Sequence, residues 1–248
     1  MGTTCSLFAL DADLAAGERW VRRTAQRLTR FSEDSELSQL NAHPGEWRPI
    51  SDEFASVLHA ALDAYAMSRG LVNAAVLPSM MAIGYSRPLA MGAGPATLEE
   101  AMPLPALPDV LELRPGEARV TAGLDLGGIA KGWMADGLAG ILGPGCLVNL
   151  GGDLRANGEW PVDVAGTALL LRDQAAATSS VRKRCWGDVH HLIDPRTGLP
   201  ARTGVSDVSV VTNTAFEAEV VAKTALLLGP SLAPAYCATN ALAWWFAR

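Results

Sequence analysis

Hydrophobic and polar positions repeat with two periods along this chain, and together they predict a mixed α+β fold. After Ser51, apolar residues recur at the i, i+3, i+4 spacing of one buried helical stripe. We expect Ser51 to cap this helix and Gly70 to follow its end. We predict further helices over residues 13–29, capped by Asp11 or Asp13, and 215–228, and a Gly-rich turn with a helix over 124–142.

Short apolar runs bounded by turn residues predict strands. The runs cover residues 3–10, 146–150, 161–164, 167–172, 206–212 and 239–247, with a hairpin formed by 110–113 and 119–121. This mixture is typical of packed helices on a mainly antiparallel sheet. Residues 31–41 are expected to be a polar loop. We treat 1–248 as a single domain, and the Gly- and Pro-rich stretch 84–109 is the candidate for an internal boundary.

Composition and charge exclude several classes of partner. The 248 residues are 49% apolar with a net charge of −6, and the basic residues cluster only at 182–184, so no footprint for nucleic acid or an anionic membrane is present. No segment has the roughly 18 uninterrupted apolar residues of a membrane span. The start of the chain lacks the basic region of a signal peptide, which predicts a cytoplasmic location. Four widely spaced cysteines indicate reduced, structural thiols.

Three segments combine glycines with polar side chains. Residues 124–132 place Asp125 and Lys131 beside three glycines at a strand-to-helix turn, where free N–H groups favour an anion such as phosphate. Residues 148–153 end a strand in two glycines and an acid, and 190–198 gather two imidazoles, a carboxylate and a guanidinium around a proline. Each segment alone is also explained as an ordinary turn whose acidic side chain bonds to its own backbone.

Taken in order, six segments resemble the ApbE family, the FAD:protein FMN transferases. The matching segments are Met1–Thr3, Ser35–Asn41, Asp125–Gly132, Asn149–Asp153, Thr178–Ser180 and His191–Gly198. The resemblance spans essentially the whole chain. It implies the tunnelling fold of that family, FAD held in a cleft with magnesium at its pyrophosphate, and transfer of FMN to a serine or threonine hydroxyl of an acceptor flavoprotein, with release of AMP.

The resemblance also implies individual site residues. Those expected to contact FAD are Met1, Phe31, Leu71, Val72, Asn73, Asp125, Lys131, Thr178 and Ser179. His191 matches the histidine near the scissile phosphate and would act as a base or transient nucleophile. The Gly128 carbonyl and Glu219 match metal ligands. Phe31 stands where the family has tyrosine or tryptophan, and its ring either stacks on the flavin or is an ordinary core residue.

Three departures from the family pattern bear on function. Asn73 replaces a flavin-site carboxylate, and Ser180 replaces a glycine and is expected to crowd a turn. Lys223 stands at a metal-ligand position, although Mg²⁺ needs oxygen ligands in octahedral geometry and an ammonium offers none. Either Lys223 takes the place of the ion and acts in catalysis as a compact positive charge, or Glu219 and Lys223 are an i, i+4 helical pair worth about 0.3–0.5 kcal/mol.

The departures leave three functions open. The chain is an active FMN transferase, or an FAD-binding member that has lost metal-dependent transfer and serves as a carrier or partner subunit. Alternatively, the same fold has been recruited to a different biosynthetic reaction.

Overall fold

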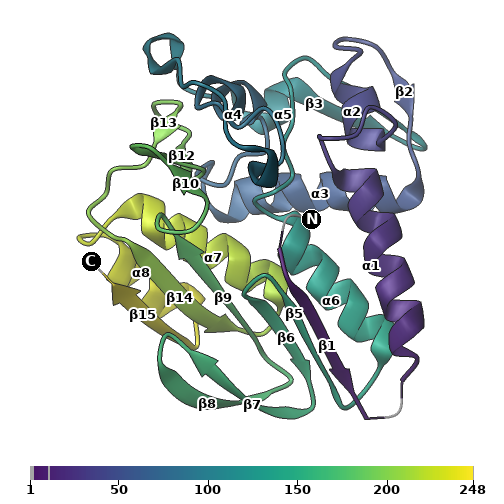
Figure 1. The fold of residues 1–248 in the computed structure, drawn as a ribbon, viewed down its shortest axis with the longest axis vertical. Helices are drawn as coiled ribbons and strands as arrows, with labels where there is room; N and C mark the ends of the chain where they lie inside the picture. The colour runs from purple at the N-terminus through teal and green to yellow at the C-terminus, as the bar shows by residue number, and fades with distance from the viewer. Residues whose placement is uncertain (1–2, 11, 248) are drawn as a thin grey trace. The chain divides into compact units, whose positions relative to one another are not determined.

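The computed structural model of the chain describes residues 3–10 and 12–247. These residues form two compact units (Figure 1). The first unit contains Ala25–Gly128 and Val181–Ala201, and the second contains Thr3–Thr24, Ile129–Ser180 and the segment from Arg202 on. The irregular stretch 84–109 therefore lies wholly within the first unit.

A six-stranded sheet forms the centre of the second unit. Its strands, in spatial order, are β1 (Cys5–Ala9), β5 (Cys146–Leu150), β6 (Asp153–Asn157), β9 (Ala175–Ser180), β14 (Asp207–Thr212) and β15 (Ala243–Ala247). Each neighbouring pair is antiparallel, which confirms the predicted sheet type. β6 and β9 were not predicted, because β9 reads Ala-Ala-Ala-Thr-Ser-Ser and alanine and serine carry little strand signal.

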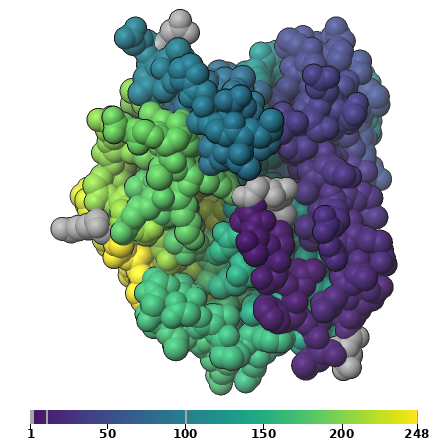
Figure 2. Space-filling view, in the orientation of Figure 1, coloured from purple at the N-terminus to yellow at the C-terminus, as the bar shows by residue number. Residues whose placement is uncertain are grey.

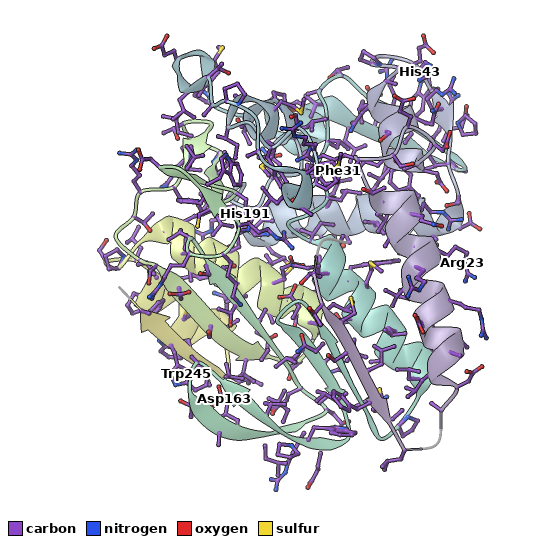
Figure 3. All side chains as sticks on the ribbon, in the orientation of Figure 1. Arg23, Phe31, His43, Asp163, His191 and Trp245 are labelled. Carbon is purple, nitrogen blue, oxygen red and sulfur yellow. The ribbon has the colours of Figure 1, made fainter. Side chains whose placement is uncertain are left out.

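The two faces of this sheet are covered differently. α6 (Ala130–Leu142) and α7 (Ala215–Leu228) pack on one face (Figure 1). The hairpin of β7 (Glu159–Val164) and β8 (Thr167–Arg172) contributes to an apolar cluster with residues of the sheet, and Trp245 of β15 packs against this cluster (Figure 3). The hairpin surface is the green region at the lower edge of Figure 2. The helix predicted at 215–228 and the strands at 146–150 and 167–172 are confirmed.

The first unit is built on α3 (Asp52–Met67), the helix predicted from its apolar stripe. Ser51 caps it by accepting a hydrogen bond from the backbone N–H of Phe54, and Gly70, with φ +86°, follows its end. A three-stranded antiparallel sheet joins β2 (Arg48–Pro49), β4 (Glu117–Val120) and β3 (Leu111–Arg114), in that spatial order. The predicted hairpin is therefore confirmed.

Several shorter elements complete the chain. They are α1 (Leu14–Leu28), α2 (Glu36–Asn41), α4 (Leu77–Ala82), η1 (Leu89–Met91), η2 (Leu98–Glu100), α5 (Leu107–Val110), α8 (Ala233–Asn240), and the two-residue strands β10 (Cys185–Trp186), β11 (Val189–His190), β12 (Ile193–Asp194) and β13 (Leu199–Pro200). Asp13 caps the start of α1 through the Ala16 N–H, as predicted, whereas Asp11 lies outside the described residues. No described helix has the length and apolarity needed to span a membrane.

Two predicted segments differ from the structure. The polar loop expected at 31–41 contains α2, because Ser35 caps this short helix by accepting from the Ser38 N–H. The strand expected at 239–247 begins only at Ala243, since α8 continues to Asn240.

Candidate functional site

A cluster of buried charges surrounds the start of α6 in the second unit. Lys131 lies in the first turn of α6, Asp153 begins β6, and Glu219 lies in α7. The Lys131 ammonium is 2.6 Å from Asp153 Oδ2 and also donates to Glu219 Oε1. The Asp153 and Glu219 side chains are 5% and 4% exposed, so Lys131 pairs with both of them in a buried ion triplet. We call these three residues with Lys223 the charge cluster.

Glu219 is the centre of the charge cluster. Its second oxygen, Oε2, accepts the backbone N–H of Gly132 at 2.8 Å, so the carboxylate caps the start of α6. The Lys223 ammonium lies 3.9 Å from Oε1. The i, i+4 pair predicted from the sequence is present, but it is not a solvated surface pair. The expectation that the N–H groups of this turn are free for a phosphate is wrong for Gly132.

The environment shifts the pKa of each member of the triplet. Burial raises the pKa of Asp153 to about 6, against the opposing effect of Lys131. Burial also disfavours the ionised form of Glu219, but Lys131 and Lys223 outweigh it and lower the pKa of this carboxyl. For Lys131, burial alone would lower the pKa, and the neighbouring Asp153 and Glu219 raise it instead. At neutral pH two ammonium groups therefore balance two carboxylates.

The raised pKa of Asp153 predicts a pH dependence of stability. The ordinary value is 3.8, so between about pH 4 and 6 the folded protein binds this proton more tightly than the unfolded chain does. The free energy of unfolding should therefore fall as the pH rises through this window, by up to about 1.4 kcal/mol per pH unit from this group. The lowered pKa of Glu219 acts below its ordinary value of 4.5, where stability is lost as the pH falls.

Urea denaturation of the wild type and of Asp153→Asn, at several pH values between 4 and 6, measures this effect. We expect the wild type to lose stability relative to the variant as the pH rises. Parallel pH profiles for the two proteins would contradict the shift.

Glycine turns and helix caps position the charge cluster. The β5–β6 hairpin turns through Gly151 and Gly152, both with positive φ. Asn149 Oδ1 accepts the Gly152 N–H at 2.9 Å, so Asn149 caps the turn that the sequence assigned to Asp153. Asp153 thus points to Lys131 instead of bonding to its own turn. α7 begins with a capping box between Thr214 and Glu217.

The first unit holds a second polar group, around Asp125. One carboxylate oxygen of Asp125 accepts the Gly127 N–H at 2.7 Å, and the other accepts from Arg30 Nε at 2.5 Å. The Arg30 guanidinium lies over the rings of Phe31 and Tyr85, at 4.2 Å and 4.7 Å from their centroids. The Arg30 side chain is 6% exposed. Asp125 therefore fixes its own glycine turn and is already neutralised by a buried cation.

Three aromatic rings pack in a row beside the ion pair of Arg30 and Asp125. The ring centroids of Phe31 and Tyr85 are 5.6 Å apart, and those of Tyr85 and Trp186 are 5.4 Å apart. Trp186 Nε1 donates to the Ile83 carbonyl at 2.8 Å. Phe31, labelled in Figure 3, is 39% exposed and so is not an ordinary core residue. Sequence reasoning missed Arg30, Tyr85 and Trp186, and only the adjacency of Arg30 to Phe31 offered a signal.

Replacing Arg30 by lysine should lower the free energy of unfolding by about 1–2 kcal/mol, since an ammonium cannot stack on two rings and also reach Asp125. Arg114→Lys is the matched control. The Arg114 guanidinium also lies over a ring, that of Trp47, at 4.1 Å, but its side chain is 48% exposed, so we expect a loss below about 0.5 kcal/mol. Urea denaturation compares the two variants. Equal losses would contradict the role given to the buried Arg30.

The loop at 71–73 lies beside Asp125 in the same unit. Asn73 Nδ2 donates to the Pro105 carbonyl at 2.9 Å, and its Oδ1 accepts the Ala75 N–H. The Asp125 N–H donates to the Ala74 carbonyl at 2.8 Å. Leu71 is half-buried and Val72 is buried. The structure thus brings the predicted residues 71–73 and Asp125 together, with both ends of the Asn73 amide holding the loop.

The two adjacent histidines of the first unit differ in role. His190 Nε2 lies 2.9 Å from the Ala201 carbonyl and its Nδ1 accepts the Leu192 N–H, so the ring is protonated at Nε2 and holds the local backbone. His191 is half-buried, and its backbone N–H donates to the Arg184 carbonyl (Figure 3). His190 is therefore structural.

The remaining predicted residues lie in both units. Thr178 Oγ1 is 2.8 Å from Ser209 Oγ, across β9 and β14, and Ser179 is buried. Ser180 is a strand residue without a positive φ, so the crowding expected from its replacement of glycine is not found. Gly128 is half-buried and follows Gly127. Met1 lies outside the described residues.

Magnesium does not fit the charge cluster. Both oxygens of Glu219 already accept hydrogen bonds, and two ammonium groups lie where like charge would repel a divalent ion. Among the side chains that the structure describes, which exclude that of Glu100, no three His, Cys, Asp or Glu residues are grouped as metal ligands.

Comparison with known proteins identifies relatives along the whole chain. A family model described as the ApbE family matches residues 1–246. An FAD:protein FMN transferase of Treponema pallidum (strain Nichols) is 31% identical over 241 residues, which cover 79% of this chain and 66% of that protein. The corresponding protein of Klebsiella pneumoniae (strain 342) is 30% identical over 123 residues, covering 43% of this chain and 38% of that protein. The chain thus spans less than two thirds of the length of these relatives.

Solved structures share the fold. The apo flavinyl transferase ApbE of Pseudomonas stutzeri has a TM-score of 0.82 at 20% identity and covers 99% of this chain and 89% of its own. An ApbE protein of Thermotoga maritima has a TM-score of 0.81 at 22% identity, with 97% and 88% covered. The predicted ApbE-like fold is therefore confirmed.

Proposed function

The chain belongs to the ApbE family, and on that premise we propose that it transfers FMN from FAD to a serine or threonine hydroxyl of an acceptor flavoprotein. In this reaction the hydroxyl oxygen bonds to the phosphorus of the FMN half, the pyrophosphate bond of FAD breaks, and AMP leaves. The named relatives are FAD:protein FMN transferases, and we infer the same activity for this chain from its membership of the family.

The observation that best supports this proposal is the half-exposed ring of Phe31 in the first unit. A flat aromatic face stacks on an aromatic ligand with ring centroids about 4.5–7 Å apart. Phe31 is held by Tyr85 and by the buried Arg30 on its face, so its orientation is fixed before a ligand arrives. The 71–73 loop is followed directly by Ala74, whose carbonyl accepts the Asp125 N–H. Such a preformed face suits the isoalloxazine ring of a flavin.

We assign the individual roles as follows from the family pattern. FAD contacts are assigned to Met1, Phe31, Leu71, Val72, Asn73, Asp125, Lys131, Thr178 and Ser179. His191 accepts the proton of the attacking hydroxyl, or attacks the phosphorus transiently itself. Lys223 supplies the positive charge that a metal ligand would otherwise help to hold. His190, which holds the local backbone, takes no part in the reaction.

Incubating the full chain with FAD and an acceptor protein tests the proposal. We expect AMP release and a gain in the mass of the acceptor equal to one FMN. His191→Ala should abolish both while FAD still binds, whereas His190→Gln, its matched control, should lower stability and keep turnover. FAD binding without any AMP release in the wild type would exclude transfer.

That outcome would favour a second candidate, an FAD-binding family member that has lost metal-dependent transfer and acts as a carrier or partner subunit. The charge cluster favours it, because a pair of ammonium groups stabilises a phosphoryl transition state less than a divalent ion does. A protein that binds no FAD by calorimetry would remove both candidates.

The other expectations from the sequence stay predictions. They are the absence of nucleic-acid and membrane partners, the cytoplasmic location, and a magnesium ion held by Gly128 and Glu219, which the charge cluster argues against. We further propose that residues 1–248 act as one ApbE-like domain, since the family model spans 1–246.

A further inference from the structure

Both oxygens of the Glu219 carboxylate accept hydrogen bonds from groups of the protein itself. Oε1 accepts from the Lys131 ammonium, and Oε2 accepts the Gly132 N–H at 2.8 Å. The residue is 3% exposed, so water does not compete for these positions. A carboxylate has about four lone-pair positions, and at Glu219 one on each oxygen is taken, so a cation bound here would share Oε1 with the Lys131 ammonium.

Two positively charged side chains lie beside this carboxylate. Lys131 is also bonded to Asp153 at 2.6 Å, and Lys223 lies 3.9 Å from Glu219 Oε1. The Lys131 and Lys223 side chains are only 15% and 14% exposed. At these distances and this burial, the repulsion between an ammonium and an incoming divalent ion is weakly screened by solvent.

We propose that Lys131 and Lys223 are the permanent counter-ions of Asp153 and Glu219, and that Lys223 takes the place of a divalent cation in this chain. The positive charge at this position is then covalently attached and always present, independent of the metal concentration. The exclusion of a divalent ion concerns the charge cluster alone. Only the consequence, metal-independent handling of FAD, rests on the proposed function.

Binding of Mn²⁺ alone to the full chain, followed by electron paramagnetic resonance, tests the exclusion without FAD. We expect the wild type and Glu219→Gln to bind Mn²⁺ equally, because the wild-type carboxylate contributes no ligand. Lys223→Thr removes the like charge and adds a hydroxyl oxygen, so it should gain a site on the order of tenfold tighter or more. Adding Glu219→Gln to Lys223→Thr should remove that gain.

Lys223→Met is the matched control for the lysine, because it removes the charge without supplying an oxygen ligand and should gain much less affinity than Lys223→Thr. Mn²⁺ binding by the wild type that Glu219→Gln abolishes would overturn the inference. A folded Lys223→Thr without any gain would overturn the part played by Lys223.

A second measurement needs no variant and so does not depend on the variants folding. An ion that binds only the native state raises the midpoint temperature of thermal unfolding. The thermal midpoint of the wild type should be the same with Mg²⁺ and with a chelator at matched ionic strength. A midpoint raised by Mg²⁺ but not by the matched sodium salt would also overturn the inference.

Discussion

Replacing Lys131 by methionine is expected to lower the free energy of unfolding by about 3–5 kcal/mol, the range for breaking a buried ion pair by removing one partner. The methionine keeps most of the side-chain volume, but it leaves Asp153 and Glu219 facing each other with only Lys223 nearby. Two buried carboxylates without their common counter-ion repel each other, and one of them must take up a proton.

Urea denaturation at neutral pH measures this loss. Arg22→Met is the matched control, since Arg22 pairs with Glu18 at 2.6 Å but the two side chains are 74% and 58% exposed. The control should change stability by less than about 1 kcal/mol. Adding Asp153→Asn to Lys131→Met should recover part of the loss, because it removes one unpaired charge. Similar losses in Lys131→Met and Arg22→Met would contradict the buried cluster.

Replacing Gly132 by alanine is expected to destabilise the protein by about 3 kcal/mol, at the upper end for overpacking a core. A Cβ at this position would lie 2.5 Å from the Ala215 carbonyl oxygen and 2.9 Å from the Phe216 Cα, and both are backbone atoms that cannot rotate away. α6 and α7 would have to separate here. That movement would strain the bond from the Gly132 N–H to Glu219, and those from the Ala215 and Phe216 N–H groups to Asp136.

Gly140→Ala is the matched control within the same helix. No atom lies within 4 Å of a Cβ at Gly140, and its φ is not positive. The substitution should therefore stabilise the protein by about 0.5–1 kcal/mol, through the higher helix propensity of alanine. Thermal or urea unfolding compares the two. A loss for Gly132→Ala below about 1 kcal/mol would contradict the close helix contact as the reason for this glycine.

The same glycine shows what a motif can and cannot predict. From their spacing alone, the glycines of residues 124–132 were expected to let the backbone approach an anion. At Gly132 the structure gives a packing reason, because the helix start touches α7 and its N–H is bonded to Glu219. The partners of Lys131 are 22 and 88 positions away in the sequence. No periodic pattern connects such distant positions, so the charge cluster could not be predicted.

The segment at 35–41 gives a second example, within the first unit. This segment matches the family pattern, yet Ser35, Glu36 and Asn41 make hydrogen bonds within the protein that hold the local structure. Ser35 caps α2, and Glu36 accepts from the backbone and hydroxyl of Ser51. Asn41 bonds to both the N–H and the carbonyl of Leu124, directly before Asp125. The motif therefore fixes the turn that carries a candidate site residue.

Elements with strong periodicity were predicted well, because their pattern is local. The stripe of α3 and the helix at 215–228 have the bounds expected from apolar spacing and caps to within a few residues. The aromatic group was not predicted, because Tyr85 lies in an irregular segment and Trp186 in a two-residue strand, and Tyr85 contacts Phe31 and Trp186 only through tertiary packing. The sequence showed that Lys223 stands at a metal-ligand position, but only the fold shows that Lys223 and Lys131 lie beside the same carboxylate, that of Glu219.

An FAD titration of the full chain tests most directly the proposal that its flavin dinucleotide site functions without a divalent cation. Flavin fluorescence would follow binding in Mg²⁺ and, separately, in excess chelator. The account predicts saturable FAD binding with the same Kd in both solutions. No saturable binding would contradict the proposed function, and binding that is lost in chelator would contradict the metal-free charge cluster.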